Sequence, residues 1–433
     1  MAQTGRAMIS GPTIWFISEV YYPDEQGTAF YTTGLAEGLA GKFKVGVLCS
    51  CPTVTARGKQ VARKEVRNGV VVERCMGTTL NKDIFILRLV NIITYSASIL
   101  LKALTRVKEG DIVFAVTSPP STPFIARLVC SLKKAECVLR IEDVYPEILI
   151  ATGMIGERSL LNGILRFVSG MLYRSADRIV VLGRDMKALA EKKMGGRGKA
   201  VRIIRSWADT DTVFPLPKED TVLVRELGLQ KKFVVSCVGN MGRAQAIECL
   251  FEAVTMLKDD DRIHFLFIGG GARRKWMEQE AVNRGLRNVT LLDQRPRDDQ
   301  ADFLNACDIS LISLLPGVTG AGVPSRTYNI MAAGKPIIAV TGEESEVARV
   351  VREEAIGWVT PPCKPEYLVR TILEAMSDKE RLINMGCKAS AAARGKFPRE
   401  KIVEEYRDLV KEIIYVHGSF DAATGETIRN RSI

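Results

Sequence analysis

The feature that most constrains the fold of this chain is an alternation of short apolar runs with segments of helical periodicity, and this alternation occurs twice. In the first half the apolar runs cover 13–20, 44–50, 111–118, 136–143 and 178–183. In the second half they cover 232–243, 264–271, 289–293, 306–315 and 335–340. Strands that are apolar along their whole length and joined by helices are typical of parallel sheets with both faces covered. The sequence therefore predicts an α/β chain of two Rossmann-like domains.

The break between the two predicted domains lies at 206–220, where acidic and proline residues replace the apolar periodicity. A length of 433 residues suits two or three domains. We therefore expect one domain at 1–206 and a second at 207–398. An amphipathic helix is predicted at 399–416, and residues 417–433, which lack apolar periodicity, are predicted to form a mobile tail.

Charge is distributed unequally between the two halves. The chain has 61 Lys or Arg and 50 Asp or Glu, which gives a formal charge of +11. Residues 1–206 carry +13, whereas residues 207–433 carry −2. With 46% hydrophobic and 26% charged residues, the composition excludes a disordered chain, a collagen-like repeat and a polytopic membrane protein. The first half is therefore expected to face something anionic.

Cysteine and histidine limit the chemistry that the chain can perform. The ten cysteines follow no spacing pattern and are predicted to be small core residues in a reducing compartment. Only two histidines are present, His264 and His417, which excludes a multi-histidine metal site. His264 lies in an apolar run and is predicted to be structural. Because residues 1–11 lack the apolar run of a signal peptide, we expect a cytoplasmic protein.

Two glycine-rich turns in the second half, 238–243 and 268–273, connect predicted strands to predicted helices. Glycine lets the backbone approach a ligand closely, and a helix N-terminus offers N–H groups to a phosphate. Neither turn matches the dinucleotide motif GxGxxG, and each alone could be only a tight connection. A third segment, 320–340, places Ser325 and Arg326 before a helix. All three segments lie at the carboxyl ends of strands, where open α/β sheets bind ligands.

Over 13–415 the chain resembles the retaining glycosyltransferases of the GT-B fold, family 4. The similarity is closest to the bacterial branch that transfers deoxy-acetamido sugars in O-antigen and capsule assembly. The segments that carry the resemblance are 21–40, 141–155, 176–186, 201–215, 239–253, 323–340 and 345–362. The resemblance implies two Rossmann-like domains that face a cleft, the first binding the acceptor and the second binding the nucleotide sugar. It also implies a C-terminal helix that crosses back to the first domain.

The resemblance implies roles for particular residues. Arg243 and Arg326 would hold the leaving diphosphate, and Asp143 would position the acceptor or the sugar, so these three are the predicted catalytic residues. Asp143 could instead be a turn residue before Tyr145. The predicted donor-binding residues are Gly239, Asn240, Gly242, Gly269, Gly270, Gly271, Ser325, Asn329 and Glu346. The predicted acceptor or phosphate loop contains Gly27 and Thr28.

The chain departs from the family pattern at several of these positions. Ala321 and Asn329 stand where many members have the two glutamates of an E-x7-E motif. Asn240 and Gln245 stand where many have Arg and Lys, and the family histidine that precedes Asp143 is absent. These departures bear on which sugar is transferred.

The expected reaction moves a sugar from a nucleotide-activated donor, expected to be a UDP-sugar, to a lipid-linked or glycan acceptor with retention of anomeric configuration. We expect this reaction in cell-surface polysaccharide assembly, without a metal, because Asp209 and Asp211 have the spacing of a metal-binding DxD motif but fall in the interdomain crossover. Two alternatives remain. A GT-B-fold nucleotide-sugar epimerase would need carboxylates and histidines at the cleft. A non-enzymatic basic protein that binds membranes or nucleic acid would leave the two glycine turns unexplained, and no nucleic-acid-binding motif is present.

The segment 84–104 has about the length of a membrane span, but Arg88, Asn91 and Lys102 interrupt it. It is predicted to be a buried or interfacial amphipathic helix. Just upstream, five cations at 57–67 form either a solvated loop or a site of attraction to anionic lipid. A polyprenyl-diphosphate-linked acceptor would favour lipid, so we expect peripheral association with the inner face of the membrane.

Overall fold

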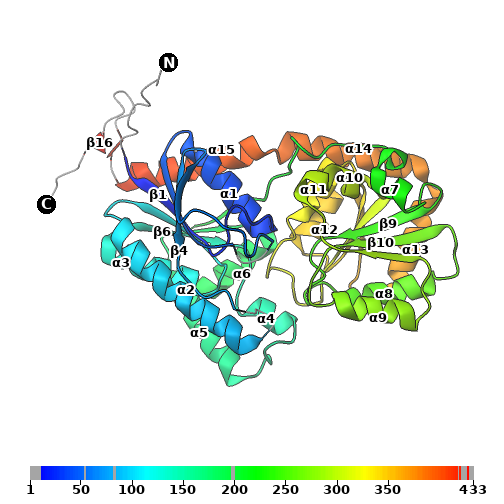
Figure 1. Cartoon of the computed structure of the whole chain (residues 1–433), viewed down its shortest axis with the longest axis horizontal. Helices are drawn as coiled ribbons and strands as arrows, with labels where there is room; N and C mark the ends of the chain where they lie inside the picture. The colour runs from blue at the N-terminus through cyan, green and yellow to red at the C-terminus, as the bar shows by residue number, and fades with distance from the viewer. Residues whose placement is uncertain are drawn as a thin grey trace, which may run out of the picture.

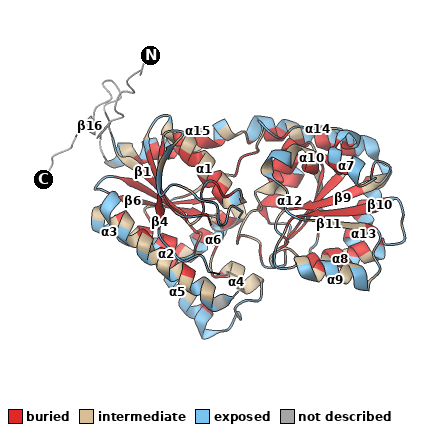
Figure 2. Ribbon diagram, in the orientation of Figure 1, coloured by how far each residue is buried: buried red, intermediate tan, exposed pale blue. Residues whose placement is uncertain are grey.

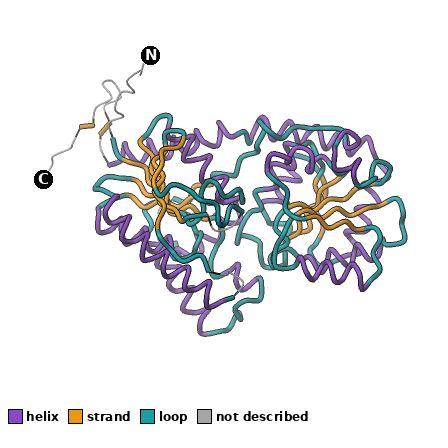
Figure 3. The backbone as a smooth tube through the Cα atoms, in the orientation of Figure 1, coloured by secondary structure: helices purple, strands orange, loops and turns teal. Residues whose placement is uncertain are grey.

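The computed structural model describes residues 11–52, 55–80, 84–196, 200–417, 419–420 and 427–428. Two parallel sheets lie side by side, and each is covered by helices on both faces (Figures 1 and 3). This is the predicted arrangement of two Rossmann-like units. Most of the predicted tail at 417–433 lies outside the described residues.

Within the described residues the first sheet has eight strands in the order β3-β4-β2-β1-β5-β6-β7-β8, and only the β3–β4 pair is antiparallel. The strands are β1 Thr13–Ile17, β2 Lys44–Ser50, β3 Lys64–Arg67, β4 Val70–Cys75, β5 Ile112–Val116, β6 Glu136–Ile141, β7 Arg178–Val181 and β8 Val201–Ile203. The strand order reverses at β1, because β2 lies on one side of it and β5 on the other. The carboxyl ends of strands at such a reversal open a crevice that can hold a ligand.

The helices of the first unit divide between the two faces of its sheet. They are α1 Gly27–Ala40, α2 Phe85–Arg106, α3 Thr122–Lys133, α4 Glu147–Ala151, α5 Leu160–Ser175 and α6 Arg184–Met194. On one face, α2, α3, α5 and α6 pack on strand residues such as Trp15 and Val113. On the other face, α1 packs on Phe16 and Phe114. Successive strand residues thus enter opposite cores, which explains why these strands are apolar throughout.

The second sheet, in residues 200–417, has six parallel strands in the order β11-β10-β9-β12-β13-β14. They are β9 Phe233–Val238, β10 Ile263–Ile268, β11 Val289–Leu292, β12 Ile309–Ser313, β13 Ile337–Val340 and β14 Gly357–Thr360. The helices are α7 Val222–Glu226, α8 Ile247–Met256, α9 Arg274–Asn283, α10 Gln300–Asn305, α11 Arg326–Ala332, α12 Glu346–Glu353, α13 Pro365–Ser377 and α14 Lys379–Lys396. This sheet also reverses its order, at β9, so its carboxyl edge opens a second crevice towards the first unit.

The last helix, α15 Arg399–His417, returns to the first unit (Figure 1). Residues of α15, among them Ile402 and Tyr406, belong to the same core as α1. Arg140 of β6 donates from Nε to the Tyr406 hydroxyl at 3.1 Å. Gly38 of α1 is needed at this contact, because a Cβ there would lie 2.8 Å from the Val403 side chain. The chain therefore crosses back as expected, which ties its end to its beginning.

Candidate active site

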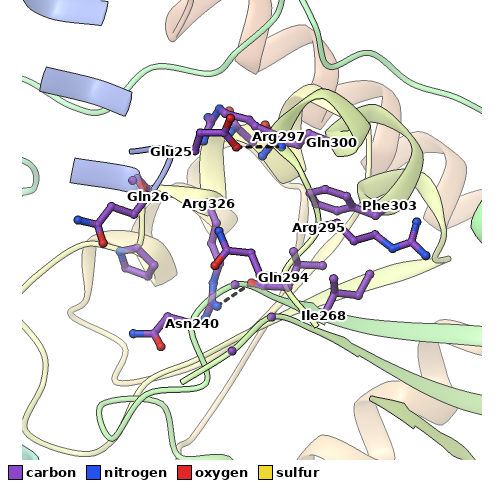
Figure 4. Close-up of a pocket in the computed structure, with 18 of the residues that line it drawn as sticks. Glu25, Gln26, Asn240, Ile268, Gln294, Arg295, Arg297, Gln300, Phe303 and Arg326 are labelled. Carbon is purple, nitrogen blue, oxygen red and sulfur yellow. Dashed lines mark hydrogen bonds between the residues drawn. The ribbon is translucent and has the colours of Figure 1, made fainter. Parts of the chain in front are cut away.

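A cavity of about 600 Å³ lies between the two units and is lined by both. The first unit contributes Glu25, Gln26, Gly27, Tyr31 and Thr55. The second unit contributes Val238, Gly239, Asn240, Gln245, Ile268, Gly269, Gly270, Gly271, Gln294, Arg295, Arg297, Gln300, Phe303, Leu304, Pro324, Ser325, Arg326 and Asn329. Figure 4 shows Glu25 and Arg297 at one end of the cavity and Asn240 and Ile268 at the other. Most predicted donor-binding residues are therefore brought together.

The two glycine turns interlock to form one wall of this cavity. The Met241 amide donates to the Gly270 carbonyl at 2.7 Å, which joins the turn after β9 to the turn after β10. Gly239 and Gly269 have φ of +118° and +140°, values that L side chains rarely adopt. A Cβ on Gly269 would also overlap the Gly239 carbonyl. Gly270 differs, since a Cβ there would meet only open space. Gly239 and Gly269 thus permit close packing within the wall, whereas Gly270 lines the cavity with free space beside it.

Arg326, the first residue of α11, anchors this wall. Its Nη1 donates to the Val238 carbonyl at 2.7 Å, and its Nη2 donates to Gln245 Oε1 at 2.7 Å. Its buried Nε has no hydrogen-bond partner among the described residues. Burial lowers the pKa of the Arg326 guanidinium. Arg326 therefore places a positive charge on the cavity wall and holds the end of β9 in position.

Arg297 is a cavity cation that the sequence reasoning missed. It follows β11 in a 3₁₀ turn, and its guanidinium lies 3.3 Å above the Phe30 ring of α1. Its Nε lies 4.0 Å from Asp209 Oδ2, and neither Nε nor Nη2 has a hydrogen-bond partner among the described residues. Burial lowers the pKa of this guanidinium. A partly buried cation with unpartnered N–H groups on a cavity wall is suited to bind an anionic ligand.

The signal for Arg297 was present in the sequence. The segment 293–299 follows an apolar run that was predicted to be a strand, so its residues should lie at the carboxyl edge of the sheet. It contains no glycine, and a search for glycine turns therefore passes over it.

Asp143 lies where the two units touch, outside the set of described residues that line the cavity. It forms an isolated antiparallel bridge with Gly322, and the neighbouring Val144 amide donates to the Ala321 carbonyl at 2.8 Å. The Asp143 side chain is solvent-accessible, yet protein surrounds it on both sides of the interface. Desolvation, followed by the charge of Glu142, raises the pKa of Asp143 to about 6.

Glu346, predicted to bind the donor, is fully buried and ion-paired instead of lining the cavity. Its Oε2 accepts from Arg184 Nε at 2.8 Å, and its Oε1 accepts from Arg205 Nε at 2.8 Å. Both arginines precede the second sheet in the chain, so this carboxylate links the first unit to α12. In the described structure Glu346 holds the two units together.

The other predicted residues differ in their distance from the cavity. Asn329 lines it and accepts from the Asp209 amide at 2.9 Å. Gly27 also lines it, and a Cβ there would lie 3.4 Å from Ser325 Oγ of the second unit. Arg243 is exposed. Neither Arg243 nor Gly242 nor Thr28 is among the described residues that line the cavity.

Two further structural findings concern the described residues only. They contain no group of three or more His, Cys, Asp or Glu side chains that could hold a metal ion. Of the helices in the described part of the chain, none is long and apolar enough to cross a membrane.

Comparison with known proteins identifies the family. The family described as "Glycosyl transferases group 1" matches residues 221–391. The Pseudomonas aeruginosa protein named "Probable glycosyltransferase WbjE" is 33% identical over 310 residues, which cover 72% of this chain and 74% of that protein. This chain belongs to the group 1 glycosyltransferases. WcaI of Escherichia coli K12, whose name provisionally gives it a glycosyl transferase role in colanic acid biosynthesis, is 25% identical over 82% of this chain and 90% of its own length.

Solved structures of GT-B glycosyltransferases have the same fold. Sucrose-phosphate synthase from Thermosynechococcus elongatus has a TM-score of 0.75 at 16% identity, over 94% of this chain and 100% of that chain. HepE of Anabaena, solved in complex with UDP-glucose, has a TM-score of 0.69 at 15% identity, over 92% and 99%. The predicted GT-B fold is confirmed, and so is the assignment as a glycosyltransferase.

Proposed function

We propose that this glycosyltransferase moves a sugar from a UDP-sugar to a lipid-linked or glycan acceptor, with retention of anomeric configuration, in cell-surface polysaccharide assembly. The observation that carries the proposal is the cavity between the two units, whose wall combines two interlocked glycine turns with Arg297 and Arg326. The complexes of HepE with UDP and with UDP-glucose support a nucleotide-sugar donor. The name of WcaI, which refers to colanic acid biosynthesis, supports a role in polysaccharide assembly.

The main barrier to such a transfer is the charge that develops in the transition state. The bond from the anomeric carbon to the diphosphate breaks, and negative charge grows on the leaving group. Cations that are fixed before the reaction lower this barrier, because they need no reorganisation as the charge develops. Arg326 is fixed by its bonds to Val238 and Gln245, and Arg297 is fixed by stacking on Phe30. We assign the diphosphate to these two arginines and to Gly269–Gly271, and the acceptor to Asp143 and the loop at Gly27 and Thr28.

Arg243 stays a prediction as a third cation for the diphosphate. It is exposed beside the first glycine turn, so it would have to turn towards the cavity when the donor binds. The 207–398 unit supplies most of the cavity wall, which supports its assignment as the donor-binding domain. The basic 1–206 unit is assigned to a lipid-linked acceptor at the inner face of the membrane.

Incubation with radiolabelled UDP-sugars and a polyprenyl-diphosphate-linked sugar, followed by product analysis, tests the proposal. Label in the lipid fraction, formed also in the presence of EDTA, is expected. Free epimerised nucleotide sugar without transfer would identify an epimerase. The absence of any turnover with a full set of UDP-sugars would contradict the UDP-sugar assignment.

A further inference from the structure

The outer surface of the helices α2, α3 and α5 is unusual in two ways that point to the same partner. Exposed apolar side chains form a stripe on each helix. They are Ile86, Leu89, Ile93 and Leu101 on α2, Phe124, Leu128 and Leu132 on α3, and Leu160, Leu161, Ile164, Phe167, Val168 and Met171 on α5. Several are exposed over most of their surface, with Leu160 at 83%, Phe167 at 64% and Leu132 at 63%. We call these three stripes together the apolar face.

The stripes lie on one side of the molecule. The three helices cover the same face of the first sheet, and their inward residues, such as Tyr95, Val129 and Leu172, share one core. The spacing of the exposed residues, three or four positions apart on α3 and α5, places them opposite that core. Figures 1 and 2 show α2, α3 and α5 together at the lower left, with outward surfaces that are mostly exposed or intermediate. Contiguous apolar surface of this kind marks an interaction site.

The second unusual feature is charge. The sequences of α2, α3 and α5 contain seven Lys or Arg and no Asp or Glu. Three of these cations pair with carboxylates outside the helices, Lys102 and Arg106 with Glu73 and Arg127 with Asp177. On α5, Arg166 is exposed in the midst of the apolar stripe, and it makes no ion pair among the described residues. A second copy of the chain on this face would bring like charges together, which is unfavourable. An anionic bilayer instead accepts both the apolar side chains and the cations.

We propose that the apolar face is the surface by which this protein binds an anionic lipid bilayer, with α5 inserted deepest. This rests on the proposed lipid-linked acceptor and names the surface that would bring the enzyme to it. Figure 1 shows α4 between α5 and the gap that separates the two units, and Ala151 of α4 lies next to Gly317 of the second unit. Docking through α5 therefore brings the interface around Asp143 near the bilayer surface.

The structure also shifts the proposed contact away from the basic cluster at 57–67. Lys64 pairs with Glu73 at 3.4 Å, and Arg67 pairs with Glu37 at 2.9 Å. Arg57 donates to the Thr79 carbonyl at 2.8 Å. Cations already engaged in the protein offer less to a lipid phosphate. Arg166 of α5 and Lys133 of α3, which make no ion pair among the described residues, are therefore expected to contribute more to binding than this cluster.

Co-sedimentation of the full chain with vesicles tests the inference. We compare phosphatidylcholine vesicles with vesicles that also contain phosphatidylglycerol, at low and high salt. The double variant Ile164→Glu/Phe167→Glu is expected to lose at least about tenfold in partitioning to anionic vesicles, because two charges would enter the apolar boundary. Lys133→Glu/Arg166→Glu is expected to lose the preference for anionic lipid. The control, Val282→Glu/Ile383→Glu, changes two even more exposed apolar residues of α9 and α14 and is expected to bind as the wild type does.

Unchanged vesicle binding by the α5 variant, or no binding by the wild type, would overturn the inference. So would a lipid-free dimer that the α5 variant converts to monomer in sedimentation velocity. Each variant is also titrated with UDP without lipid. Retained UDP binding with lost vesicle binding supports the apolar face, whereas absent UDP binding in every protein would count against the proposed function alone.

Discussion

The two units of the molecule have the same architecture but leave different groups unsatisfied. In the second unit helix charges are paired, as in Arg274 with Glu278 and Arg284 with Glu280, and the unpartnered N–H groups of Arg297 and Arg326 lie at the cavity. In the first unit the unsatisfied surface is the outer side of α2, α3 and α5. The fold therefore does not decide what each unit binds, because the decisive groups lie in the strand-end loops of one unit and on the helix exteriors of the other.

The two units also differ in how firmly their parts of the cavity wall are held. The cavity wall of the second unit is held by interlocked glycines and by the bonds of Arg326, whereas the first unit contributes the loop at Glu25–Gly27. A preorganised wall suits the diphosphate, where charge changes during reaction. The following changes test this difference between the two units, from the largest expected effect to the smallest.

The largest effect is expected from Gly269→Ala in the wall of the second unit. The change forces a side chain into a backbone conformation that favours glycine and into the Gly239 carbonyl. Strain and overpacking together are expected to lower the free energy of unfolding by about 3 kcal/mol. Urea denaturation measures this, with Gly270→Ala as the matched control in the same turn, expected to unfold as the wild type does. Equal stability of the two variants would show that the wall is not built on close glycine packing.

Comparing the turnover of Arg326→Ala with that of Arg243→Ala tests whether a fixed cation matters more than an exposed one. Arg326 lies on the cavity wall, and its loss is expected to reduce turnover on the order of 10²-fold. The same loss is predicted from the sequence for Arg243, but its exposed position leads us to expect a change of only about threefold or less. Steady-state kinetics with saturating donor measure both. Comparable losses would place Arg243 at the diphosphate and require the first glycine turn to rearrange.

Arg297→Met is expected to weaken UDP binding without lowering the stability of the protein. Methionine keeps the contact with Phe30 and removes a buried charge with unsatisfied N–H groups. Affinity for UDP is expected to fall by roughly 10- to 100-fold, the value of one to two hydrogen bonds to a charged group. The unfolding temperature without ligand should stay the same or rise. Calorimetry and thermal unfolding check the pair of outcomes, and unchanged affinity would remove Arg297 from the ligand site.

Asp143→Asn in the first unit is expected to have the smallest effect on stability, and that effect should depend on pH. The pKa of Asp143 is raised from its ordinary 3.8 to about 6, so the folded state binds its proton more tightly than the unfolded state does. Its ionisation therefore costs stability as pH rises from about 4 to about 6. The variant should unfold at a slightly higher temperature than the wild type near neutral pH and at the same temperature below about pH 4. If ionised Asp143 acts in transfer, the acidic limb of kcat/KM near pH 6 should also disappear.

The sequence predicted the two parallel sheets well because most strands are buried on both faces. It missed the inner strand β4, whose apolar run is interrupted by Glu73 and Arg74, and the three-residue edge strand β8. It also missed β3 and β14, which are edge strands, since Lys64–Arg67 alternates exposed with half-buried residues and Gly357–Thr360 is mostly half-buried. Neither has the continuous apolar run that identifies an inner strand. Lys64 and Arg67 therefore belong to a strand, whereas the pattern of charges alone left open a solvated loop or a site of attraction to anionic lipid.

The sequence predicted those site residues whose backbone geometry requires glycine. It predicted less well those side chains whose position depends on partners distant in the sequence. Glycine at 239, 269 and 271 signals that other atoms approach the backbone closely, and all three positions line the cavity. Nothing in the sequence around Glu346 indicates its partners, because Arg184 and Arg205 lie more than 140 residues away. Only the folded structure shows that its carboxylate is ion-paired. Arg297 likewise gains its position only when Phe30 is packed beneath it.

The most direct test of the account is calorimetric titration of UDP into the wild type and into Gly270→Leu. Gly270 lines the cavity, and a Cβ there meets only open space, so leucine should occupy the ligand site without disturbing the turn. We predict that the wild type binds UDP, with or without EDTA, and that the variant unfolds at the same temperature but loses measurable binding. Equal binding by the two proteins would place the nucleotide elsewhere, and a wild type that binds no UDP would contradict the assignment of the donor.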